Sequence, residues 1–107
     1  MTRNVIILDV AKPDFSDIKN HVKSQFGETV WNEVNQEFKD VIKAIGTNPE
    51  AGTCLEELKV YGLTNFRQRL VRQTRVIYEF NDSEGLVHMF IHTKRDFRTH
   101  LEKRFLL

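Results

Sequence analysis

The stretch Phe66-Arg-Gln-Arg-Leu-Val-Arg-Gln-Thr-Arg-Val-Ile-Tyr-Glu-Phe-Asn-Asp-Ser-Glu-Gly-Leu-Val-His-Met-Phe-Ile-His92 decides the fold. It contains three runs, 66–71, 75–80 and 86–92, in which period-two alternation or β-branched and aromatic residues are typical of strands. Asn81-Asp-Ser-Glu-Gly85, between the last two runs, has the composition of a hairpin loop. Because connections this short join antiparallel neighbours, we expect a three-stranded meander.

One further strand and two helices are predicted before this stretch. Asn4–Val10 is a short β-branched run typical of a buried strand. Pro13 suits the first turn of a helix that stops at Gly27, and a second helix is expected from about Thr29 to Ile45, ended by Gly46. Apolar residues recur at spacings of three and four in both helices: Phe15, Ile18, Val22 and Phe26, then Val30, Val34, Phe38, Val41 and Ile45. Two such stripes need a sheet to cover them.

The tail carries Phe97, Leu101 and Phe105 at four-residue intervals, which predicts a short C-terminal helix. Pro49 and Gly52 indicate turns, and the residues that follow them, through Gly62, fit no regular pattern. The expected order is therefore β-α-α-β-β-β-α. This is an α+β fold with an antiparallel sheet, an N-terminal helical hairpin packed on it and a short C-terminal helix, and we expect residues 1–107 to form a single domain.

The formal net charge of +1 conceals an uneven distribution of charged residues. Residues 1–58 hold six Lys/Arg and ten Asp/Glu, a net of −4, whereas residues 59–107 hold ten and five, a net of +5. Seven of the eight arginines lie in the second part. Arginine presents a planar fork of donors that fits phosphate and carboxylate, so this part can bind an anionic partner, although a solvated, salt-bridged surface has the same composition.

Composition argues against several kinds of site. Cys54 is the only cysteine, so the chain cannot form an internal disulfide or a zinc site built on paired thiolates, and we expect no metal and no cofactor. No stretch approaches the roughly 18 consecutive apolar residues of a membrane span. The segment Met1–Asp9 is too short and too soon charged for a signal peptide, which predicts a cytoplasmic protein without a membrane partner.

Four short motifs resemble a known family. They are Ala11-x-x-Asp14-Phe-x-x-Ile18, Asn48-Pro-Glu-Ala-Gly52, Arg75-Val-Ile-Tyr-Glu79 and His92-Thr-Lys-Arg-Asp96. Their order along the predicted topology resembles the RelE/ParE superfamily of toxins from type II toxin–antitoxin systems, closest to the ParE branch. The family often has an aromatic residue where this chain has Thr74, and a glycine in the turn that is here Val71-Arg-Gln-Thr74.

The resemblance implies the toxin component of a bacterial toxin–antitoxin system, which arrests growth, stabilises plasmids and is neutralised by a cognate antitoxin. The pair represses its own operon, so operator DNA is contacted only indirectly, through the antitoxin. ParE-type toxins are described as inhibitors of DNA gyrase with no catalysis of their own. This is the function that we expect first.

An alternative is a ribosome-dependent endoribonuclease of the RelE kind, with the ribosome and mRNA as partners. The catalytic candidates would then form one basic region: Arg67, Arg69, Arg75, His92 and Arg95. No tyrosine or carboxylate stands where those enzymes place a general base or acid, and only His92 and His100 lie nearby. A second alternative is a degenerate binding module without toxicity.

Candidates for contact with the target or the antitoxin are aromatic, apolar and cationic residues: Trp31, Lys94, Arg95, Phe97, Arg98, Leu101 and Phe105. Trp31 also fits the edge of a core. If the C-terminal helix packs only lightly on the sheet, its apolar residues are exposed beside Arg95 and Arg98, where an acidic and apolar antitoxin segment could cover them.

Overall fold

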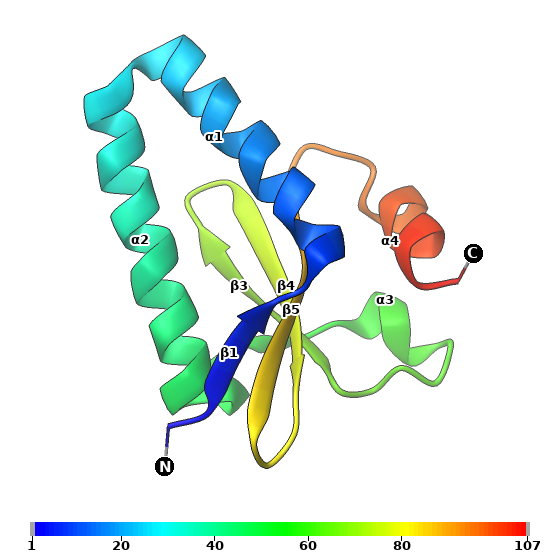
Figure 1. Cartoon of the computed structure of the whole chain (residues 1–107). Coiled ribbons are helices and arrows are strands. Elements are labelled where there is room, and N and C mark those ends of the chain that lie inside the picture. The colour runs from blue at the N-terminus through cyan, green and yellow to red at the C-terminus, as the bar shows by residue number, and fades with distance from the viewer. Residues whose placement is uncertain (1, 107) are drawn as a thin grey trace.

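A five-stranded sheet in the order β1-β5-β4-β3-β2 divides the molecule into three layers (Figure 1). The computed structural model describes residues 2–106. The strands are β1 (Asn4–Ile7), β2 (Thr53–Cys54), β3 (Phe66–Val71), β4 (Thr74–Phe80) and β5 (Glu84–His92). The helices are α1 (Lys12–Phe26), α2 (Glu28–Thr47), α3 (Glu56–Lys59) and α4 (Phe97–Phe105). The expected α+β fold class is confirmed.

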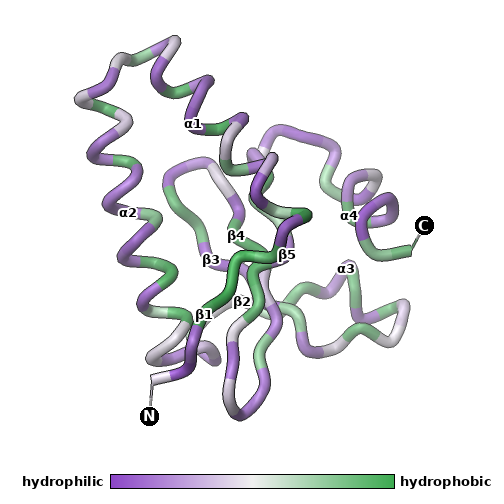
Figure 2. The backbone as a smooth tube through the Cα atoms, viewed as in Figure 1, coloured by the Kyte–Doolittle hydropathy of each residue, from purple (hydrophilic) through white to green (hydrophobic). Residues whose placement is uncertain are grey.

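The helical hairpin of α1 and α2 packs on one face of the sheet. Polar and apolar residues alternate along both helices (Figure 2), as helices with one buried side require. Phe15 of α1 joins the layers, since its ring lies edge-on to Trp31 at 5.6 Å and to Phe38 and Phe90 at 5.2 Å between centroids. The buried residues of this first core are Ala11, Trp31, Val34, Phe38, Ile45, Val71, Val76, Tyr78, Val87 and Phe90.

The opposite face of the sheet carries a second core under α3 and α4. Its buried residues are Leu55, Leu58, Phe66, Ile77, Met89, Ile91, Phe97 and Leu101. Because β4 and β5 send alternate side chains to the two cores, Tyr78 faces the helical hairpin and Ile77 faces α4. Phe97 and Leu101 of the C-terminal helix α4 are therefore core residues that cover this face of the sheet.

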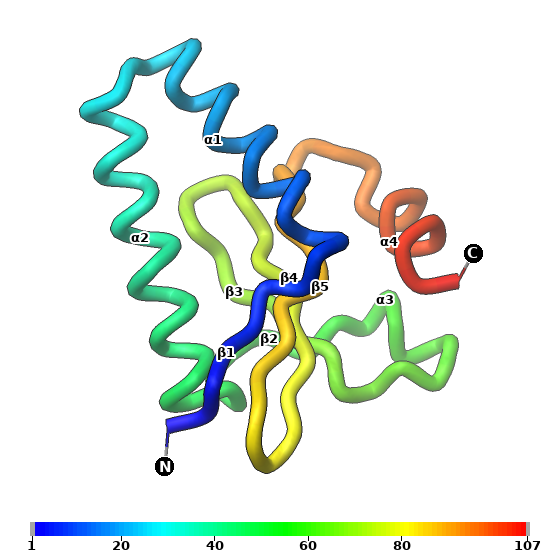
Figure 3. Tube along the Cα trace, in the orientation of Figure 1, coloured from blue at the N-terminus to red at the C-terminus, as the bar shows by residue number. Residues whose placement is uncertain are grey.

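The first strand is shorter than expected and pairs differently. It ends at Ile7, and residues Asp9–Ala11 form a turn of 3₁₀ helix that leads into α1. β1 runs parallel to β5, although its residues are far from β5 along the chain (Figure 3). The antiparallel meander of β3, β4 and β5 is as predicted, and β1 adds a parallel strand at its edge.

Gly46 does not end the second helix, which continues to Thr47. The glycine is needed for packing, because β1 passes close to it: the Arg3 backbone N–H donates to the Gly46 carbonyl at 2.8 Å. A Cβ at position 46 would lie 2.8 Å from the Arg3 carbonyl oxygen. The segment without a sequence pattern forms the edge strand β2 and the one-turn helix α3, which were not predicted.

The turn between β3 and β4 contains two residues, Arg72 and Gln73, since Val71 pairs directly with Thr74. Arg72 adopts φ +53°, a conformation usually left to glycine, and no glycine is present. Its guanidinium pairs with Glu37 of α2 at 2.8 Å. The turn is therefore fastened to the helical hairpin.

Candidate functional site

The arginines of the central strands do not form the single basic region that the ribonuclease alternative requires. Arg67 pairs with Tyr78 and Arg69 with Val76, so both side chains lie on the face covered by the helical hairpin. Arg75 lies on the opposite face, where its guanidinium stacks over the ring of Phe97 at 4.4 Å. The expectation of one basic region was wrong, because alternate residues of a strand point to opposite faces.

Arg67 is held by backbone carbonyls. Its Nη1 donates to the carbonyl oxygens of Glu50 and Gly52 at 3.1 and 2.9 Å, and its guanidinium lies 5.9 Å from the centre of the Phe80 ring. These contacts fix the turn before β2. A hollow of about 310 Å³ beside Arg67 and Phe80 is lined mainly by polar loop residues. Arg67 therefore has a structural role in the free chain.

The guanidinium of Arg75 also contacts neighbouring side chains. Its Nη1 donates to the Gln68 side-chain oxygen at 3.0 Å, and Phe97 of α4 covers the guanidinium. On this face β3 contributes Phe66, Gln68 and Leu70, so no lysine or arginine of β3 stands beside Arg75. A pair of strand cations around a scissile phosphate is absent from this face of β3 and β4.

The apolar binding candidates are largely inside the molecule. Trp31 is 4% exposed, Phe97 9% and Leu101 2%. Phe105 is half-buried, with its ring 4.9 Å from that of Phe66. The C-terminal helix does not pack lightly on the sheet, because Phe97, Leu101 and Phe105 belong to the second core, whereas Trp31 lies in the first. Arg98 is exposed on the outer side of α4.

Three other candidates meet in one groove. A cavity of about 440 Å³ lies between α1, the end of β5 and α4, and it brings His92, Lys94 and Arg95 together. His21 of α1 and His100 of α4 also line it. The remaining lining residues are Asp14, Asp17, Ile18, Val22, Thr74, Met89, Phe90, Ile91 and Arg104. Sequence reasoning had given no role to Asp14, Asp17 or His21 here, since nothing local shows that α1 faces α4.

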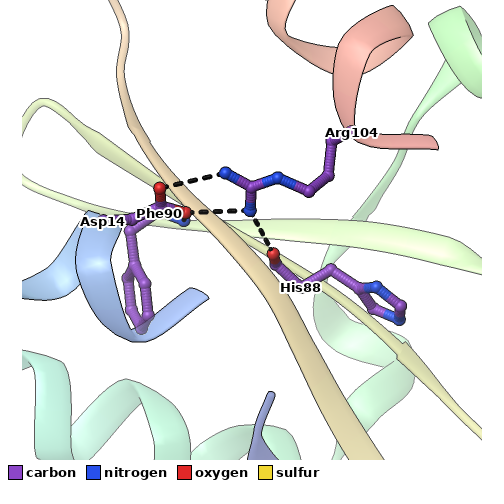
Figure 4. A network of polar contacts seen from close by, with 4 residues as sticks. All are labelled: Asp14, His88, Phe90 and Arg104. Atoms are coloured by element: carbon purple, nitrogen blue, oxygen red, sulfur yellow. Dashed lines mark hydrogen bonds and ion pairs between the residues drawn. The ribbon is translucent and has the colours of Figure 1, made fainter. Parts of the chain in front are cut away.

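A partly buried ion pair between Asp14 and Arg104 holds the two sides of this groove in place (Figure 4). Arg104 Nη2 and Nη1 donate to the two oxygens of Asp14 at 3.0 and 3.1 Å, and Nη1 also donates to the His88 carbonyl at 2.8 Å. Asp14 in turn accepts the Phe90 backbone N–H at 3.2 Å. β1 pairs with β5 only as far as Val87. Beyond that point the Asp14 and Arg104 side chains therefore provide hydrogen-bond partners for the exposed backbone groups at the edge of β5, the Phe90 N–H and the His88 carbonyl.

In both histidines near the loop after β5 the free ring nitrogen is Nε2, but it carries a proton in one and a lone pair in the other. His92 Nδ1 accepts the Lys94 backbone N–H at 3.0 Å, so its proton is on Nε2, which is a donor. His100 Nδ1 lies 2.8 Å from the Asp96 carbonyl oxygen, which can only accept, so in the neutral ring Nε2 keeps a lone pair. The groove thus contains one imidazole donor and one imidazole acceptor.

Asp96 fixes the start of α4 beside these histidines. Its carboxylate accepts the Thr99 side-chain O–H at 2.8 Å and the Thr99 backbone N–H at 3.2 Å. These two hydrogen bonds lower the pKa of the Asp96 carboxyl below its ordinary value, so the cap stays ionised at neutral pH. The loop that carries Lys94 and Arg95 is therefore tied at both ends.

Two negative findings apply to residues 2–106. No group of three or more His, Cys, Asp or Glu side chains there is arranged to hold a metal ion. None of the helices in this range is both long and apolar enough to span a membrane.

Comparison with known proteins identifies the fold. No family model and no curated protein matches the chain. A chain of the solved structure described as "Chromosomal ParDE TA system from P. aeruginosa" superposes with a TM-score of 0.68 over 87% of this chain and 98% of that chain. This protein has the fold of that ParDE chain. Because the two sequences are 11% identical, the likeness to the ParDE chain concerns the fold.

Proposed function

We propose that this protein is the toxin of a bacterial toxin–antitoxin pair, that a cognate antitoxin neutralises it and that it inhibits DNA gyrase without catalysis of its own. The likeness to the ParDE chain, which extends over 98% of that chain, is the observation that carries the proposal. The motifs at residues 11–18, 48–52, 75–79 and 92–96 point to the same branch of toxins independently.

The contacts and positions of Arg67 and Arg75 also support a toxin that acts by binding its target. Arg67 donates to two carbonyls, Arg75 is covered by Phe97, and the two lie on opposite faces of the sheet. Electrostatic catalysis of RNA cleavage needs donors that converge on one phosphate. These arginines do not converge.

The order in which cellular processes stop tests the proposal. The gene is induced in a bacterium that lacks the antitoxin, and incorporation of labelled thymidine and methionine is followed. A gyrase inhibitor should arrest growth and stop thymidine incorporation first, and co-expression of the antitoxin should restore both. Unimpaired growth at high expression would remove the toxin assignment, and an earlier loss of methionine incorporation would remove gyrase as the target.

A ribonuclease acting from the groove is the second candidate, favoured by the complementary nitrogens of His92 and His100. In that reaction the His100 Nε2 lone pair would take the proton of a ribose 2′-OH, and the 2′-oxygen would attack phosphorus. The P–O5′ bond would break, with His92 Nε2–H donating a hydrogen bond to the leaving 5′-oxygen, solvent water supplying its proton and Arg95 stabilising the charged phosphate.

This candidate predicts discrete cuts in message during translation, each leaving a 2′,3′-cyclic phosphate. His100→Gln and His92→Gln should each reduce cutting by about 100-fold or more. Arg67→Gln is the matched control, because Arg67 lies outside the groove. Intact message during growth arrest, or undiminished cutting by both histidine variants, contradicts this candidate.

A further inference from the structure

Strand β1 forms one edge of the sheet, and within residues 2–106 no other strand pairs with its outer side. Leu8 N–H, just after this strand, donates to the Val87 carbonyl of β5 at 3.0 Å. Successive residues of a strand direct their backbone groups to alternate sides, so the backbone groups of Val5 and Ile7 point away from β5. Their N–H donors and carbonyl acceptors therefore lie at an open edge.

The open part of this edge, residues 5–7, is closed at both ends. At its start, Arg3 N–H donates outward to the Gly46 carbonyl at 2.8 Å, so the C-terminal end of α2 occupies the edge there. At its other end, Asp9–Ala11 turn away as a 3₁₀ helix. A long strand from another protein would run into α2. β1 of a second copy also ends at Ile7 and turns away, so it fits the window.

The side chains along this window are apolar. Val5 and Ile7 pack against the first core, which directs Ile6 to the other face of the sheet. There Ile6 is 37% exposed and lies beside the half-buried Leu86 of β5. Edge strands commonly carry a charge or a proline that prevents pairing, and residues 4–8 contain neither. Only the shortness of β1 therefore restricts what can pair with it.

The charges at the two ends of the window favour antiparallel pairing of identical strands. Arg3 precedes it, and its guanidinium, which donates to the Asn81 carbonyl at 2.6 Å, forms no ion pair with the residues that the structure describes. Asp9 follows it, and although Asp9 pairs with Lys12 at 2.9 Å, its side chain is 95% exposed. Antiparallel pairing places the cationic start of one copy beside the anionic end of the other, whereas parallel pairing brings like charges together.

We infer that two copies of this chain pair through β1, antiparallel about a twofold axis at Ile6, so that their sheets join. Val5 of each copy lies opposite Ile7 of the other, and the two residues exchange both N–H···O hydrogen bonds. The two Ile6 residues face each other in a non-hydrogen-bonded pair, where side chains come closest. Because the contact is small, we expect a dissociation constant of about 100 µM. The inference concerns the folded chain and does not depend on the toxin assignment.

Hydrogen exchange followed by NMR tests the outer edge without any substitution. The Val5 and Ile7 amides should exchange about threefold more slowly at about 1 mM chain than at about 50 µM, because the dimer protects them. The Ile6 and Leu8 amides face β5, so their exchange should depend far less on concentration.

Disulfide cross-linking tests the register. In a chain with Cys54→Ser, which removes the native free thiol, Ile6→Cys should form a covalent dimer on mild oxidation. The two Cα atoms at position 6 lie about 4.5 Å apart in this pairing, within the range that a disulfide spans. Asn4→Cys is the matched control on the same face. Its Cα lies about 14 Å from that of its counterpart, and it should cross-link at least tenfold less.

A charge on the axis should prevent pairing. Ile6→Lys should raise the dissociation constant, measured by sedimentation equilibrium, at least tenfold, because two like charges face each other. Val10→Lys makes the same kind of change at a position that is 54% exposed and lies outside the strand, and it should change the constant less than twofold. Circular dichroism verifies that both variants fold.

Four results would each overturn the inference. They are exchange of the Val5 and Ile7 amides that is independent of concentration, equal cross-linking of the two cysteine variants, equal effects of the two lysine variants, and a dimer in which the Val5 and Ile7 amides stay unprotected. Protection of these amides only when a different protein is added would also overturn it, because another strand then covers the edge.

Discussion

Replacing Arg104 by Ala removes the ion pair between Asp14 of α1 and Arg104 of α4. Three hydrogen bonds are lost, two of them charge-assisted bonds to Asp14, and Asp14 keeps only the Phe90 N–H. Breaking a fully buried pair costs about 3–5 kcal/mol. Because the two side chains remain 24% and 19% exposed, water can partly solvate Asp14, and we expect a loss of about 2–3 kcal/mol in the free energy of unfolding.

Urea denaturation followed by the fluorescence of Trp31, the only tryptophan and a buried one, measures this loss. In a double-mutant cycle with Asp14→Ala, the two single losses should exceed that of the double variant by about 1–2 kcal/mol. Arg98→Ala is the control, because Arg98 is exposed on the same helix, and it should stay within about 0.5 kcal/mol of the parent. Equal losses for Arg104→Ala and Arg98→Ala, or strictly additive effects of the Asp14 and Arg104 changes, would refute the assigned role of the ion pair.

Further predictions concern two glycines and one tyrosine. Gly46→Ala should destabilise by about 1–3 kcal/mol in the same denaturation assay, although alanine favours helix, because its Cβ would lie 2.8 Å from the Arg3 carbonyl; a stabilised variant would contradict this packing. Gly52→Ala should cost at least as much, since its Cβ would collide with the Tyr78 hydroxyl; a loss below about 0.5 kcal/mol would show that the turn can move. Burial raises the pKa of the Tyr78 phenol above its ordinary value, so folding favours the protonated form. The ionisation of Tyr78 should therefore leave the free energy of unfolding unchanged below about pH 10. Above that pH the unfolded chain loses the phenol proton more readily than the folded chain does, so the free energy of unfolding should fall. Tyr78→Phe should remove that part of the alkaline loss, and an unchanged pH profile would contradict the assignment.

Patterned segments of the sequence predicted helices α1, α2 and α4 and strands β1, β3, β4 and β5. The spacing of Phe15, Ile18 and Val22 predicted a helix with one buried side, and the β-branched and aromatic run 75–80 predicted a strand. The two-residue strand β2 and the single turn α3 are too short to produce a period. The parallel pairing of β1 with β5 joins residues about 80 positions apart in sequence, such as Asn4 and Glu84, and no local pattern encodes it.

The candidate site was predictable only in part. His92, Lys94 and Arg95 were identified from a local motif, and all three line the groove. Asp14 was identified only as part of the motif at residues 11–18, because its partner Arg104 is 90 positions away. The separation of Arg69 from Arg75 follows from the two-residue turn at Arg72 and Gln73, which places Leu70 opposite Arg75. The missing glycine concealed that turn, since Arg72 occupies the position with positive φ.

Supercoiling of relaxed plasmid by purified gyrase, in the presence of increasing amounts of this protein, tests the central claim most directly. The account predicts inhibition or accumulation of cleaved DNA at a small molar excess, and recovery of activity when the antitoxin is added first. His92→Gln and His100→Gln should inhibit as well as the parent chain does, because no catalysis is involved. Full gyrase activity at a large excess of folded protein would contradict the account.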